Sequence, residues 1–126
     1  MNVSPVNSVS FGRLHIPNDS NTAKSLNQIA WNKNILNEMN SCFANINAKT
    51  GNTDVFLKVA HFEHEDDKHR EWWSLHITDK EDNHLGGCDI TRKEPESHYI
   101  SRLRTLAKYC KPSAAENVDD ILKKYR

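Results

Sequence analysis

The pattern that governs the architecture of this chain lies in residues 53–92, TDVFLKVAHFEHEDDKHREWWSLHITDKEDNHLGGCDITR. Apolar and polar residues alternate in three runs of this stretch, Val55–Glu63, Glu71–Thr78 and Leu85–Thr91. A period of two is the spacing of a half-buried β-strand. Because the charged connections between the runs are short enough for hairpins, the stretch predicts a three-stranded antiparallel meander.

The two faces of this predicted sheet differ in composition. One face collects the cleaner apolar row, which we assign to a helix-covered core: Val55, Leu57, Val59, Trp73, Leu75, Ile77, Cys88 and Ile90. The opposite face mixes aromatic, basic and polar side chains: Phe56, Lys58, Phe62, Trp72, Ser74 and His76. If the apolar rows share a face, opposed residues of the first two strands have the same parity, so we expect Leu57 or Val59 to pair with Ile77 or Leu75.

Helical spacing flanks this sheet on both sides. A long helix is predicted from Thr22 to about residue 46, with Asn21 or Thr22 as its N-cap. Gly51 suits a left-handed cap after it. A second helix is predicted to start at Pro95, and a third at the capping-box pattern of residues 113–116. The expected fold is therefore α+β, a three-stranded antiparallel β-meander flanked by a long N-terminal helix and two C-terminal helices, in the order α-β-β-β-α-α.

The domain organisation follows from length and composition. A chain of 126 residues builds one core, and we assign residues 21–126 to a single α+β domain. Residues 1–20 are rich in Asn, Ser and Pro, which predicts a flexible or docking N-terminal segment. Four apolar residues could form a short edge strand there: Val9, Phe11, Leu14 and Ile16. No apolar run approaches the ~20 residues of a membrane span, and no signal peptide is evident, so we expect a cytoplasmic protein without membrane contact.

Charge is distributed unevenly along a chain whose formal net charge is zero. Residues 53–94 carry six Lys and Arg against eleven Asp and Glu. Phosphate binding depends on clustered basic side chains, so the acidic sheet argues against nucleic acid as a partner. The alternative place for nucleic-acid binding is the basic C-terminal part of the chain, at Arg102, Arg104, Lys108 and Lys111.

Candidate catalytic and metal-binding groups give no assignable site. His61 and His64 are three residues apart, which sends their side chains to opposite faces of a strand. His64 and His76 could share a face near Glu65 or Asp66, but a third ligand is missing. Cys88 lies on a strand in the acidic part of the chain, where a packed thiol is favoured over a nucleophile. We therefore predict no catalytic residue, no metal and no cofactor, and the sequence favours a protein that is not an enzyme.

The mixed face of the sheet is the strongest candidate for function. Exposed aromatic patches on proteins mark interaction sites, and Trp is a frequent anchor of interfaces. We predict a small protein-interaction, adaptor or inhibitor-type module that binds a protein partner through this face, with a homodimer as another arrangement. The predicted partner-binding residues are Phe62, Trp72, His76, His64 and Lys58. The alternative functions are a small metal-dependent enzyme that uses the sheet histidines and acids, and nucleic-acid binding through the C-terminal helices.

Overall fold

The computed structural model describes residues 12–91, 94–108 and 116–125, and of residues 67–70 the backbone only. Strands and helices follow one another along these residues in the order β-α-α-β-β-β-α-α. The elements are β1 (Leu14–His15), α2 (Ser20–Ile29), α3 (Lys33–Asn47), β2 (Val55–His64), β3 (Asp67–Thr78), β4 (His84–Thr91), α4 (Glu96–Ala107) and α5 (Val118–Lys123). The mixed α+β class is thereby confirmed, whereas the predicted element order is only partly right.

The sheet has four strands in the order β1-β2-β3-β4. Strands β2, β3 and β4 form the expected antiparallel meander, and Leu57 pairs with Ile77 and Val59 with Leu75, as parity predicts. The sheet gains a fourth strand, β1, which includes Leu14 of the short edge strand considered near the N-terminus. The correction to the three-stranded meander is that β1 pairs with the start of β2 in the parallel sense. A parallel pair needs a crossover connection, and α2 and α3 supply it.

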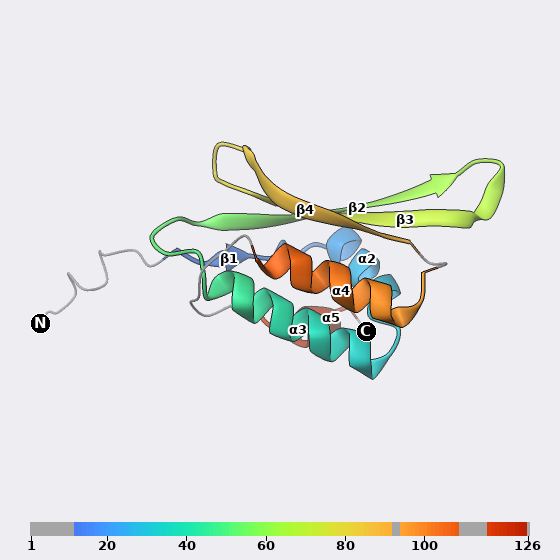
Figure 1. Cartoon of the computed structure of the whole chain (residues 1–126), viewed down its shortest axis with the longest axis horizontal. Coiled ribbons are helices and arrows are strands. Elements are labelled where there is room, and N and C mark those ends of the chain that lie inside the picture. The colour runs from blue at the N-terminus through green and yellow to red at the C-terminus, as the bar shows by residue number, and fades with distance from the viewer. Residues whose placement is uncertain (1–11, 92–93, 109–115, 126) are drawn as a thin grey trace, which may run out of the picture.

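The molecule is built of two layers, a helical layer and the sheet (Figure 1). All four described helices lie on one face of the sheet, and no described element covers the other face. The β2–β3 hairpin runs past the end of the helical layer. None of the described helices combines the length and the apolar content that crossing a bilayer requires.

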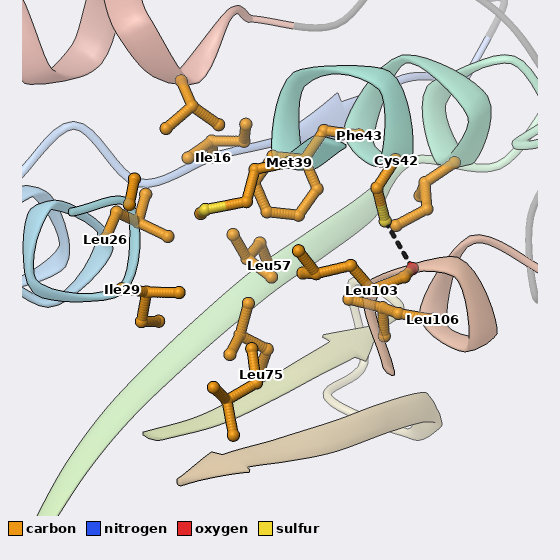
Figure 2. Packing of buried hydrophobic residues seen from close by; sticks show 14 of the residues in the cluster. Ile16, Leu26, Ile29, Met39, Cys42, Phe43, Leu57, Leu75, Leu103 and Leu106 are labelled. Atoms are coloured by element: carbon orange, nitrogen blue, oxygen red, sulfur yellow. Dashed lines mark hydrogen bonds between the residues drawn. The ribbon is translucent and has the colours of Figure 1, made fainter. Parts of the chain in front are cut away.

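The core fills the space between the two layers (Figure 2). Leu57 and Leu75 of the sheet face Met39 and Phe43 of α3, and all four side chains are fully buried. Leu103 of α4 joins them, and its carbonyl accepts a hydrogen bond from the Cys42 thiol at 2.7 Å. The predicted apolar row is thus the buried row of the sheet.

The predicted long N-terminal helix is wrong, because it is two helices, α2 and α3. Asn32 adopts an extended conformation between them, and its side chain accepts a hydrogen bond from the Ile35 amide at 2.9 Å. Both helices bury their apolar residues against the same core, so the spacing of apolar residues continues across the break and hides it. The N-cap of α2 is also corrected, to Asp19, which accepts from the Thr22 amide at 2.7 Å.

The C-terminal helices agree with the sequence more closely. Helix α4 begins directly after Pro95, as predicted. Helix α5 begins at Val118, and Asn117 caps it by accepting from the Asp119 amide at 2.8 Å. Of the capping-box pattern predicted at residues 113–116, only Glu116 lies among the described residues. Gly51 has a φ of 61°, but it belongs to the turn beyond the end of α3.

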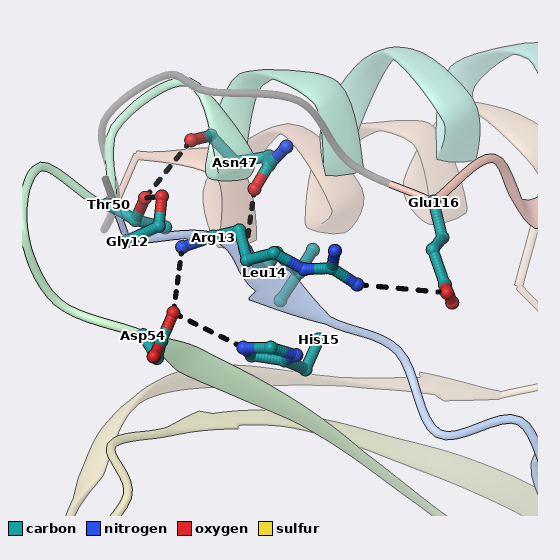
Figure 3. A network of polar contacts seen from close by, with 8 residues as sticks. All are labelled: Gly12, Arg13, Leu14, His15, Asn47, Thr50, Asp54 and Glu116. Atoms are coloured by element: carbon teal, nitrogen blue, oxygen red, sulfur yellow. Dashed lines mark hydrogen bonds and ion pairs between the residues drawn. The ribbon is translucent and has the colours of Figure 1, made fainter. Parts of the chain in front are cut away.

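Strand β1 is held by polar contacts to α3 and to the start of β2 (Figure 3). The Leu14 amide donates to Asn47 Oδ1 at 2.6 Å, and the Arg13 amide donates to Asp54 Oδ1 at 3.2 Å. The Thr50 hydroxyl donates to the Gly12 carbonyl at 2.6 Å. Leu14 itself is fully buried. Leu14 belongs to the docking segment expected near the N-terminus, of which Val9 and Phe11 lie outside the described residues.

Candidate functional site

The candidate site is the sheet face that the described helices leave uncovered, which we call the outer face. Alternate residues of β2, β3 and β4 form it: Phe56, Lys58, Ala60, Phe62, Trp72, Ser74, His76, Gly87, Asp89 and Thr91. The register places Phe62 opposite Trp72 and Lys58 opposite His76. Because the alternate row is buried under the helices, the mixed row of the sequence lies on the face that no described element covers.

An aromatic pair dominates one end of the outer face. The rings of Phe62 and Trp72 are stacked, with their centroids 5.1 Å apart and their planes 16° from parallel. Phe62 is 44% exposed, and Trp72 is half-buried. An offset stack of two rings presents a wide, rigid apolar surface, and such pairs gain about 0.5–1.5 kcal/mol beyond burial.

A histidine occupies the middle of the outer face. His76 is half-buried, and its Nε2 is hydrogen-bonded to the Ser74 hydroxyl. Its ring packs edge-on against His84, with centroids 5.0 Å apart. Gly87 of β4 lies so close to β3 that a Cβ at this position would be 2.7 Å from His76 Nδ1 and from the Leu75 carbonyl oxygen. The absence of a side chain at Gly87 thus lets the His76 ring lie against β4.

The remaining two predicted site residues lie far apart along β2. Lys58 is exposed and forms an ion pair with Asp82 of the β3–β4 loop. His64 is exposed at the end of β2, beyond a register shift, and its Nδ1 accepts from the Asp66 amide at 3.3 Å. Six residues along the strand separate the two, roughly 20 Å at the usual rise of a strand. Because His76 is opposite Lys58, His64 and His76 cannot bind one metal ion together.

A different group of ligand-type side chains meets on the helix-facing side of the β2–β3 hairpin. His61, Glu63 and Glu71 have nitrogen and oxygen atoms that all lie within 4.8 Å of one another. Sequence reasoning missed this group, because it compared His61 only with His64. The parity rule contained the missing signal, since extending the Leu57–Ile77 pairing places His61 opposite Trp73 and Glu63 opposite Glu71.

Cys88 does not have the surroundings of a nucleophile. It lies opposite Leu75 on the core side of the sheet, and burial raises the pKa of its thiol to about 12. The ring of His84, a residue close to Cys88 in the sequence, packs against His76. A thiol with so high a pKa is protonated at neutral pH and unreactive.

The basic residues of α4 are engaged with acidic partners. Arg102 forms an ion pair with Glu94 at 2.8 Å, and Arg104 forms one with Glu38 at 2.7 Å. Lys108 is exposed, and Lys111 lies outside the described residues. Two of the four cations considered for nucleic-acid binding are therefore already paired with carboxylates.

Comparison of the chain with protein-family models, with curated proteins and with solved structures gives no match. The class that fold and surface define is a small two-layer α+β domain with one face of its sheet uncovered by any described element.

Proposed function

We propose that this protein is a binding module that holds a partner protein against its outer face. The observation that carries the proposal is the one-sided helical layer, which leaves the stacked Phe62–Trp72 pair without a described cover. The Phe62 side chain is 44% exposed, so part of its apolar surface is in contact with water. Contiguous surfaces of this kind mark interaction sites.

The aromatic pair would supply the anchor of such an interface. A Phe or Trp side chain buries about 150–250 Å² when it is covered, and apolar burial contributes about 25 cal/mol per Å². The two rings together can thus contribute several kcal/mol to binding, offset by the cost of association. His76 and Lys58 add polar groups beside the anchor, which is the usual arrangement of an apolar centre with a polar margin.

The charge of the sheet region defines the partner's chemistry. Residues 53–94 hold eleven acids against six bases, and Asp89, Glu65 and Asp66 are exposed on or beside the outer face. Complementary potential favours association, so the partner should present an apolar patch edged by Lys and Arg. An adaptor or an inhibitor-type protein that recognises such a patch fits this description.

The test is capture of a partner from native lysate by the wild-type protein and by matched variants. We expect Phe62→Ser and Trp72→Ser to abolish capture while circular dichroism and melting temperature stay close to wild type. Trp31→Ser is the control, because Trp31 is 47% exposed but lies in the helical layer, between α2 and α3. Capture should also weaken as ionic strength rises from about 0.05 M to about 0.5 M, because screening reduces the charge attraction.

A photo-crosslinking residue at position 62 then locates the contact. Crosslinks to a basic, apolar partner from position 62, and none from position 31, are the expected result. Crosslinks to a second copy of this chain would show that the face is a homodimer interface and would contradict the proposal. Unfolding of the Trp72→Ser variant together with undiminished capture by Phe62→Ser would place Trp72 in the core and overturn it as well.

A further inference from the structure

We propose that His61, Glu63 and Glu71 bind one divalent transition-metal ion on the helix-facing side of the β2–β3 hairpin. This inference does not depend on the proposed function, because the three residues lie on the opposite side of the sheet from Phe62 and Trp72. It adds a metal site to a protein in which spacing along the chain indicated no metal-binding motif.

Two of the three ligands are held in place by the fold. The His61 ring stacks on Trp73 with centroids 5.0 Å apart and planes 12° from parallel. Trp73 is fully buried, and its indole nitrogen donates to Gln28 of α2 at 3.2 Å. His61 Nε2 lies 2.8 Å from Glu71 Oε2. An imidazole nitrogen and a carboxylate oxygen therefore already face each other, and the ring that carries the nitrogen rests on a buried tryptophan.

The charges of the group point to a cation. Glu63 and Glu71 are directly opposite each other in the register, and like charges in that position destabilise a sheet. The Glu71 side chain is only 11% exposed, so its carboxylate has lost most of its hydration. A divalent ion bound between the two carboxylates would offset the repulsion between them.

The distances suit a transition metal. Zinc binds imidazole nitrogen and carboxylate oxygen at about 2.0–2.2 Å, which places tetrahedral ligand atoms about 3.4 Å apart. The ligand atoms here lie within 4.8 Å of one another, so a small rotation completes the set. Glu63 is exposed, so its side chain has room to make that rotation. A mixed imidazole and carboxylate set favours Zn²⁺ or Mn²⁺ over Ca²⁺ and Mg²⁺, which prefer oxygen ligands alone.

The experiment uses the full chain, stripped of metal with a chelator, and titrates it with ZnCl₂ or MnCl₂ in a calorimeter. We expect one tight equivalent and a higher melting temperature, since an ion that binds the folded state stabilises it. Glu63→Gln should lower the metal affinity of this site by at least about 10–100-fold. Loss of a residue that only hydrogen-bonds to a metal ligand already has an effect of that size. This variant keeps its fold because Glu63 is exposed. His61→Gln should have the same effect.

Controls separate this site from scattered surface histidines. His64→Gln and Glu65→Gln change exposed neighbours outside the group and should leave the tight equivalent intact. Acidification should release the ion, because the imidazole must be neutral to bind it. Three results would each overturn the proposal. They are an equal metal affinity of Glu63→Gln and wild type, binding of neither Zn²⁺ nor Mn²⁺ by wild type, and tighter binding of Ca²⁺ or Mg²⁺ than of these two ions.

Discussion

At the scale of single residues, Gly87 illustrates how the sheet makes room for a site. Gly86 and Gly87 lie where the pairing of β3 with β4 becomes irregular and where β4 approaches His76 closely. The register shifts between Ile77 and Thr78, next to the Ile77–Gly86 pair, and Gly87 lies opposite His76. Its missing side chain allows the imidazole to lie against the strand.

The residue-scale prediction is that Gly87→Ala destabilises the protein by about 1–3 kcal/mol, the usual cost of overpacking. The added Cβ would be 2.7 Å from a backbone carbonyl, which cannot move aside as a flexible side chain can. Urea denaturation measures the change in the free energy of unfolding. Proton NMR of the imidazoles should show that the His76 signals shift.

Gly51→Ala is the matched control for that prediction. Gly51 has a positive φ, but beyond its chain neighbours no atom lies within 4 Å of the position that an alanine Cβ would take. Only backbone strain of about 1 kcal/mol is therefore expected. The His76 signals should stay in place. A Gly87→Ala variant as stable as wild type would refute the close contact.

At the scale of elements, β1 shows how a two-residue strand is secured. Two residues provide too little pairing to hold a strand by themselves. Asn47, at the end of α3, compensates by accepting from the Leu14 amide at 2.6 Å, and Asn47 is fully buried. A polar side chain of the helix thus completes the hydrogen bonding of the strand.

The element-scale prediction is that Asn47→Ala lowers the free energy of unfolding by about 1–3 kcal/mol, because it leaves a buried amide without this acceptor. Chemical denaturation measures the loss, and hydrogen exchange should show faster exchange of the Leu14 amide than in wild type. Asn45→Ala, an exposed change in the same helix, should cost less than about 0.5 kcal/mol. Equal stability of the two variants would contradict the docking role of Asn47.

At the scale of the whole molecule, one core joins the helical layer to the sheet. Leu57 of β2 is fully buried beside side chains of α3 and α4. Small domains with one core usually unfold in a single cooperative step. The two layers should therefore lose their structure together.

The whole-molecule prediction is that tryptophan fluorescence and far-ultraviolet circular dichroism report one coincident transition. Leu57→Ala should shift both signals equally and cost about 2–5 kcal/mol, the usual range for a buried leucine. Lys58→Ala, one residue away and exposed, should cost less than about 1 kcal/mol. Two separate transitions would show that the layers are independent units.

The sequence by itself determined the local pattern of the sheet. The adjacent residues Trp72 and Trp73 were assigned to opposite faces by parity, and the structure has one half-buried and the other fully buried. The pairings Leu57–Ile77 and Val59–Leu75 followed from the same rule. Alternation along a strand is a consequence of backbone geometry alone, which is why it can be read without knowledge of distant contacts.

Tertiary structure decided what that pattern could not. Apolar spacing is the same for one long helix and for two helices on one core, so the break is seen in the structure, where Ala30 ends α2 and Asn32 caps α3. The group of His61, Glu63 and Glu71 depends on the pairing of two strands, since spacing along the chain reports a single element. Whether the outer face meets water depended on where the helices pack, because the side of a sheet that a helix covers is set by burial summed over the whole domain.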